Sequence, residues 1–180
     1  MNKNLSLAIE KAVEQINPKD NFPINKSKSD KKPDLFSLTT NTTGTPNDAF
    51  GYSALEMNTT GSANDAFGHK ALEENTTGSY NTAVGSLALD DNTTASNNTA
   101  LGYQALTANT TGTENVAIGA GALDANTTHN QHVAVGFEAL TSVNGTGGNT
   151  AVGWKAMHQA TTGGMNTGIG KECMEGLTTG

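Results

Sequence analysis

The residues of this sequence with the types needed for metal binding or acid–base chemistry are four histidines and seventeen acids, spread over 180 positions. His129 and His132 are three residues apart, close enough to share a metal ion. His69 and His158 fall at other phases of an internal repeat, so folding does not gather all four. We therefore interpret the histidines as solvent-exposed corner residues, and we expect no metal and no cofactor.

The acids recur at fixed spacing. Asp48 and Asp65 are 17 residues apart, and Glu56, Glu73 and Asp90 follow the same interval. Stacked carboxylates can hold a cation such as Ca²⁺. Facing solvent, they would instead confer solubility and discourage end-to-end aggregation, and we favour this second interpretation. No constellation of nucleophile, base and acid emerges, so we expect that the protein is not an enzyme.

The spacing of these residues follows the internal repeat. Each unit resembles "NTALGYQAL" (98–106), with a small residue and a large apolar residue before a glycine, and a leucine or methionine four residues after it. Repetition at a fixed period decides the architecture of a chain. The glycines are spaced by 17 residues without insertion or deletion: Gly51, Gly68, Gly85, Gly102, Gly119, Gly136, Gly153 and Gly170.

A unit of 17 residues is too short for a helix pair or a propeller blade, but it suits one coil of a β-solenoid with two or three short strands. We predict an all-β fold, a parallel β-solenoid (β-roll) of about eight such coils over residues 41–180. Strand candidates are the "NTAVG" and "xxAL" stretches, with "NTTG" at the corners. Recurring asparagines are expected to form amide ladders along the stack.

Each coil offers only two large apolar side chains and two alanines. A monomeric solenoid of that composition would bury little surface, so we expect the alanine face to meet other copies of the chain. Three parallel chains around an axis would supply the missing core, which predicts a homotrimer.

Two segments precede the array. Residues 1–16 are predicted to contain a short α-helix with an apolar stripe, and it serves either as an anchor or oligomerisation helix or as a surface helix on the protein's own body. Residues 17–40 are rich in proline and lysine and are predicted to form an extended arm or linker. The stripe that we expect to bind a partner consists of Leu5, Ile9, Val13 and Ile16.

The net charge of the first 40 residues differs in sign from that of the array. Residues 1–40 carry seven lysines and five acids (+2), whereas residues 41–180 carry three lysines and twelve acids (−9), and the sequence has no arginine. An acidic array repels phosphate backbones, so we expect no nucleic-acid binding. No apolar stretch approaches membrane-spanning length, and residues 1–18 lack an uninterrupted secretory-type segment, so we expect no membrane insertion.

The residue after each repeat glycine varies most, and variable positions on a rigid scaffold are suited to recognition. Tyr103, Phe137 and Trp154 occupy this position. They can stack on a sugar or contact a protein, or else cover the edge of their own coil. Paired threonines at the "NTT" corners are reminiscent of ice-binding faces, and the same triplets fit glycosylation acceptors.

At these residues the chain resembles known repeats. "NVAIGAGAL" (115–123) and "NTAVG" (81–85 and 149–153) resemble the head motif of YadA-like trimeric adhesins, and "NTALGYQALTANTTG" (98–112) is similar to shaft repeats of bacteriophage tail fibres and other viral fibres. The resemblance covers residues 41–180. It implies a left-handed parallel β-roll that trimerises.

The resemblance implies a structural fibre or adhesin of a virion or phage-like particle. Residues 1–40 would attach to a larger virion or baseplate-type assembly, and the repeats would form a shaft or a tip that meets a host glycan or protein. We therefore expect a location on the virion or on the surface of an extracellular particle. The alternatives are a trimeric cell-surface adhesin head, for which the export signal and membrane anchor are not evident, and a monomeric ligand-binding or ice-binding solenoid.

Overall fold

The computed structural model describes residues 38, 40–143, 145–160 and 162–176. The predicted helix (1–16) and its apolar stripe lie outside the described residues, as does nearly all of the predicted arm (17–40). Nearly all of the described residues belong to the repeat array. None of them forms an α-helix, and none forms a helix able to cross a membrane.

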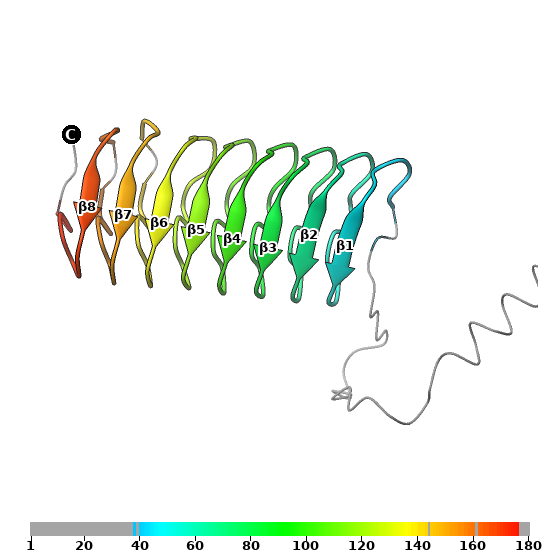
Figure 1. The fold of residues 1–180 in the computed structure, drawn as a ribbon, viewed down its shortest axis with the longest axis horizontal. Helices are drawn as coiled ribbons and strands as arrows, with labels where there is room; N and C mark the ends of the chain where they lie inside the picture. The colour runs from blue at the N-terminus through cyan, green and yellow to red at the C-terminus, as the bar shows by residue number, and fades with distance from the viewer. Residues whose placement is uncertain (1–37, 39, 144, 161, 177–180) are drawn as a thin grey trace, which may run out of the picture. The chain divides into compact units, whose positions relative to one another are not determined.

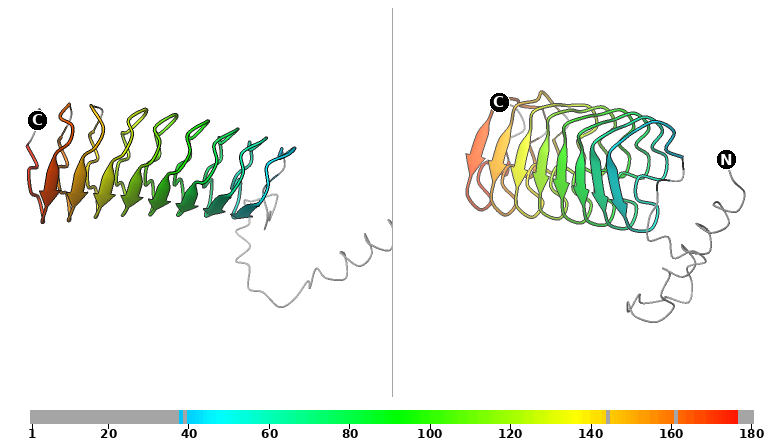
Figure 2. Two further views of the ribbon diagram at one scale, coloured as in Figure 1. Left: turned by 45° about the horizontal axis from the view of Figure 1, so that its top comes forward. Right: turned by 45° about the vertical axis from the view of Figure 1, so that its right-hand side comes forward.

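The array is an all-β parallel solenoid, as predicted (Figure 1). Its strands form one parallel sheet in which each pairs with the next in chain order, and every register is offset by 17 residues, as in Ala83↔Ala100. The views in Figure 2 show the strands side by side along one wall of the stack. The strands are β1 (Asn47–Phe50), β2 (Asn64–Phe67), β3 (Thr82–Val84), β4 (Thr99–Leu101), β5 (Val116–Ile118), β6 (Val133–Val135), β7 (Thr150–Val152) and β8 (Thr167–Ile169).

Each coil contains one strand, so the prediction of a second strand at the "xxAL" stretch is wrong. In the coil of β4, Gly102 has φ +139°, and Gln104 and Leu106 have φ of +54° and +55°. A positive φ recurs at every second residue here, so the chain folds into consecutive turns instead of extending. Hydrogen bonds to the next coil continue through these turns, with Leu106 N–H donating to the Ala122 carbonyl at 2.9 Å.

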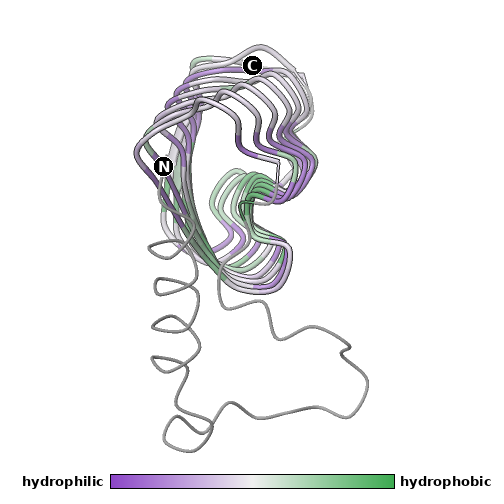
Figure 3. Ribbon diagram, turned by 90° about the vertical axis from the view of Figure 1, so that its right-hand side faces the viewer, coloured by the Kyte–Doolittle hydropathy of each residue, from purple (hydrophilic) through white to green (hydrophobic). Residues whose placement is uncertain are grey.

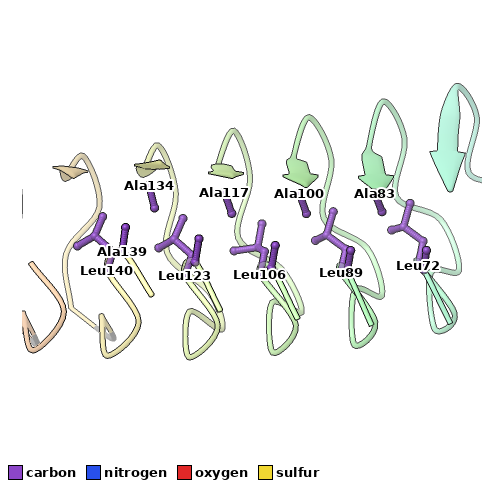
Figure 4. Packing of buried hydrophobic residues seen from close by; sticks show 14 of the residues in the cluster. Leu72, Ala83, Leu89, Ala100, Leu106, Ala117, Leu123, Ala134, Ala139 and Leu140 are labelled. Atoms are coloured by element: carbon purple, nitrogen blue, oxygen red, sulfur yellow. The ribbon is translucent and has the colours of Figure 1, made fainter. Parts of the chain in front are cut away.

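The alanines face the interior of the coil, so the prediction that they meet other copies is wrong. Side chains alternate across a strand, and Ala100 points inward at 0% exposure while Leu101 points outward. Ala105 and Leu106 on the facing turn are also fully buried. Figure 4 shows the strand alanines directed at the row of leucines opposite. The interior between strand and turn is narrow, and the small strand alanines and the turn leucines fill it together.

The buried leucines adopt a conformation that leucine usually avoids. Leu55, Leu72, Leu89, Leu106 and others of the same position have φ between +52° and +55°. A left-handed residue other than glycine costs about 1–2 kcal/mol, whereas full burial of a leucine contributes about 1.5–3 kcal/mol. Burial therefore offsets the backbone strain at each coil. In Figure 3, viewed along the stack, hydrophobic residues gather on the inward-folded part of the outline and on the wall that faces it.

The glycine after each strand allows the coils to approach closely. A Cβ built on Gly102 would lie 2.7 Å from the carbonyl carbon of Gly119 in the next coil. The same atom on Gly170 would meet nothing nearer than 3.9 Å, although Gly170 also has a positive φ, +127°. The two glycines thus share the backbone requirement and differ in the space around them.

We predict that Gly102→Ala destabilises the array more than Gly170→Ala. Both variants incur the backbone strain, about 1–3 kcal/mol, but only Gly102→Ala also forces two coils apart. Thermal unfolding followed by circular dichroism should show the larger loss, several degrees more, for Gly102→Ala. Equal losses would mean that backbone conformation alone selects glycine at this position.

Candidate assembly and recognition surfaces

The outer face of the sheet carries one continuous line of large apolar side chains, which we call the outer row. Each member is the last residue of its strand and points away from the core. Leu101 is 45% exposed and Ile169 71%, and Phe50 and Phe67 stack on each other with centroids 6.5 Å apart. The outer row consists of Phe50, Phe67, Val84, Leu101, Ile118, Val135, Val152 and Ile169.

A second line of outward side chains runs beside the outer row, two residues earlier in each strand. It begins with exposed carboxylates at Asp48 and Asp65, which lie in register on β1 and β2. It continues with threonine or valine, as at Thr99 and Val116. The sheet face therefore carries the apolar outer row along its length, with threonine or valine beside the row over β3–β8 and carboxylates beside it at the β1 end.

The position after each glycine forms a column of side chains in which two pairs of aromatic neighbours stack. Tyr52 stacks on His69, with ring centroids 5.5 Å apart. Phe137 stacks on Trp154 at 6.2 Å, and the Nζ atoms of Lys155 and Lys171 lie 4.9 and 5.0 Å from the Trp154 ring centroid.

The three predicted receptor-contacting residues differ in how far their rings are exposed to solvent. Phe137 and Trp154 are partly exposed, and each uses at least one ring face within the array. Tyr103 is 55% exposed, and its neighbours in the column are the small residues Ser86 and Ala120. Of the three, Tyr103 is therefore best placed to offer a ring face to a ligand.

The predicted asparagine ladders are confirmed, and they are buried. In the first ladder a backbone N–H donates to the side-chain oxygen of the asparagine one coil earlier, as from Asn98 to Asn81 Oδ1 at 3.0 Å and from Asn115 to Asn98 Oδ1 at 3.0 Å. From Asn47 to Asn149, the Nδ2 of each asparagine in this ladder also donates to a corner carbonyl, as from Asn98 to Gly112 at 2.9 Å. The first ladder contains Asn47, Asn64, Asn81, Asn98, Asn115, Asn149 and Asn166.

The second ladder joins the asparagines of the "NTT" corners. Asn92 Nδ2, for example, donates to Asn75 Oδ1 at 2.8 Å, and both side chains are fully buried. An acceptor asparagine in this position is not accessible to a glycosylating enzyme once the array has folded. The second ladder contains Asn41, Asn58, Asn75, Asn92, Asn109 and Asn126.

The histidines depart from the prediction at one point. His132 is fully buried, so its interpretation as a solvent-exposed corner residue is wrong. It occupies the first ladder between Asn115 and Asn149, a place that the 17-residue spacing assigns to asparagine. His69 is exposed and His129 partly so, and His158 Nε2 lies 3.2 Å from Glu138 Oε2.

The acidic columns stack in register, but Asp90 is partly buried, so the expectation that its column faces solvent is wrong at this residue. Burial, and then the charge of Glu73 one coil earlier, raise the pKa of Asp90 to about 6, and Lys70 opposes the shift. Lys70 itself pairs with Glu73 at 2.6 Å. Among the described residues, no group of three or more His, Cys, Asp or Glu side chains is arranged to hold a metal ion.

These features define a class of protein by architecture, a parallel β-solenoid of 17-residue coils with asparagine ladders inside and an apolar row outside. Comparison with protein-family models, with curated proteins and with solved structures finds no match to this chain. The function is therefore inferred from the surfaces of the array.

We predict that Asn98→Ala destabilises the array by about 2–4 kcal/mol, since it removes several hydrogen bonds and leaves the buried Asn115 N–H without its acceptor. Thr94→Ala, at an exposed corner position, is the control and should change stability little. Chemical denaturation of both variants checks the prediction. A loss for Asn98→Ala no greater than for the control would show that the ladder contributes little.

Proposed function

We propose that this protein is a structural fibre of a virion or phage-like particle, in which three parallel copies of the array form a rigid shaft or host-binding tip. The observation that supports this proposal best is the outer row. It runs the length of the array on one flat sheet face, and monomeric soluble proteins rarely leave a large continuous apolar patch uncovered.

The geometry of the row favours copies of the same chain as its cover. Coils repeat every ~4.8 Å along the stack, so a parallel copy presents a side chain of the same kind at each level. Three copies can converge with their outer rows on a common axis. Asp48 and Asp65 then lie at the margin of the contact, where carboxylates can stay hydrated.

The burial of the alanines changes the reason for expecting a trimer. The coil already encloses its own core of alanine and leucine, as at Ala100 and Leu106. The association is therefore not needed to complete the inside of the coil. It is needed to cover Leu101, Ile118 and their equivalents outside.

The surfaces that stay exposed in such a trimer supply the recognition role. Tyr103, Phe137 and Trp154 belong to the column after the glycines, which lies in the turns beyond the strand ends. We assign contact with a host glycan or protein to this column, and attachment to the parent particle to residues 1–40. We propose no enzymatic activity.

An ice-binding solenoid is the rival function that the threonines raise. At five corners the first hydroxyl is already used, as where Thr59 Oγ1 donates to the Thr76 carbonyl at 2.8 Å. Only the second threonine, such as Thr60, faces solvent. A single line of exposed threonines matches an ice surface less well than two parallel lines would, and this favours the fibre. A measurement of thermal hysteresis decides between the two functions.

We predict that the protein sediments as a trimer, with a mass three times the 18.5 kDa of one chain. The double variant Leu101→Asp, Ile118→Asp should sediment as a monomer, because carboxylates in the outer row would have to be buried without partners. Its circular dichroism should still show β-structure, since neither side chain belongs to the coil interior. Analytical ultracentrifugation measures the association.

Tyr80→Asp is the matched control for this variant. Tyr80 is exposed and lies outside the strands, two residues before β3, so the change adds a carboxylate without altering the outer row. It should leave the trimer intact. A monomeric parent chain at micromolar concentration, or a double variant that remains trimeric, would remove the outer row from the proposal.

We predict that Ile9→Asp with Val13→Asp abolishes incorporation of the protein into its parent assembly. Burying unpaired carboxylates costs several kcal/mol, and the hydrogen-bonded ladders of the array begin only after residue 40. Co-purification with the assembly measures incorporation, and circular dichroism measures the fold. Asn4→Asp with Gln15→Asp, which places two carboxylates off the apolar stripe, should incorporate normally.

Either of two results contradicts the anchoring role. The double variant on the stripe could still incorporate normally, which would place attachment elsewhere. Alternatively its β-structure could be lost together with incorporation, which would make residues 1–16 part of the folding unit.

A further inference from the structure

His132 is the one residue that departs from asparagine between the first and last rungs of the first ladder. Its backbone N–H donates to Asn115 Oδ1 at 2.9 Å, as an asparagine at this rung would. Its ring nitrogen Nδ1 accepts the backbone N–H of Asn149 at 3.3 Å. Nδ1 therefore carries no proton, and the neutral ring holds its proton on Nε2.

This arrangement leaves a buried donor without a partner. The side chain is fully buried, and Nε2 makes no hydrogen bond in the described part of the chain. The second ladder ends close to this point, because Val143 and then Ala160 take the places of asparagine, and Asn126 Oδ1 is left without a donor. Both ladders are thus incomplete between the coil of β6 and the coil of β7.

The surroundings offer no charge to a protonated ring. On its own coil the neighbouring titratable group is His129. On the coil before, Glu114 is exposed and binds Gln131 Nε2 through Oε2 at 2.9 Å. On the coil after, residues 144–154 contain no charged side chain.

We propose that the junction between β6 and β7 is an acid-sensitive joint, at which protonation of His132 removes a rung of the first ladder and lets the coils of β7 and β8 open. A proton on Nδ1 turns an acceptor into a donor that faces the N–H of Asn149, so this hydrogen bond is lost. An imidazolium buried without a counter-charge is then relieved by opening of the junction.

The direction of the pH dependence follows from linkage. Burial, and then His129, lower the pKa of His132 from 6.5 to about 4 in the closed array. The open state binds the proton more tightly, so the stability of the junction is complete above pH 6.5 and is lost as the pH falls towards 4. Between pH 7.5 and pH 5 the opening equilibrium constant should rise about 30-fold.

Hydrogen exchange of the full chain at pH 7.5 and pH 5, corrected for intrinsic exchange rates, tests the joint. The amides that join β6 to β7, including those of Asn149 and Gly153, should lose protection about 30-fold. The equivalent amides of Asn98 and Gly102, which join coils with asparagine in both ladders, serve as the internal reference and should not change.

Two variants separate the role of His132 from a general effect of acid. His132→Asn restores the ladder and should abolish the loss of protection at pH 5. Val143→Asn adds one rung to the second ladder by giving Asn126 Oδ1 a donor, and it should raise protection of the same amides at both pH values while keeping their ratio. The proposal is overturned if protection falls equally in all coils, if His132→Asn keeps the loss, or if the His132 ring titrates near pH 6.5 by NMR.

Discussion

The whole array depends on one constraint, the stacking of each residue on its equivalent 17 positions later. Backbone groups, asparagine amides and apolar side chains all find their partners in the next coil. At a rise of ~4.8 Å per coil, an amide side chain is long enough to reach both the next rung and a corner carbonyl. Asparagine therefore satisfies the interior polar groups that a coil this small cannot pair within itself.

The same constraint explains why the coil can be narrow. A strand alanine such as Ala100 and a turn leucine such as Leu106 fill the interior between them, and the left-handed conformation of the leucine turns its side chain inward. Because the core of each coil is small, stability comes mainly from contacts between neighbours. The large apolar residues at the strand ends are not part of this core and lie on the outer face of the sheet.

Much of this could be predicted from the sequence, because a strict period fixes which residues stack whatever the shape of the coil. The parallel register and both ladders follow directly from it. The period does not say which side chains point inward. That choice depends on the turns after Gly102, where Gln104 and Leu106 adopt positive φ, a conformation that neither residue type signals. The expectations for the "xxAL" strand and for the alanine face failed for this reason.

His132 shows that the position of a residue within the 17-residue repeat predicts its environment better than its spacing from other residues of the same type. The spacing of the histidines from one another suggests exposed corners. The 17-residue period instead places His132 in the column of Asn115 and Asn149, and membership of a buried column decides its environment more firmly than its residue type does.

A stack held together by neighbour contacts is only as strong as its weakest junction. Regular rungs such as Asn98 to Asn115 add stability to their own junctions and none to the junction after His132. Lengthening the array with perfect repeats would therefore leave its first opening event unchanged. His132 and Val143 are only single departures from the asparagine columns. They nevertheless determine the junction at which this solenoid opens first.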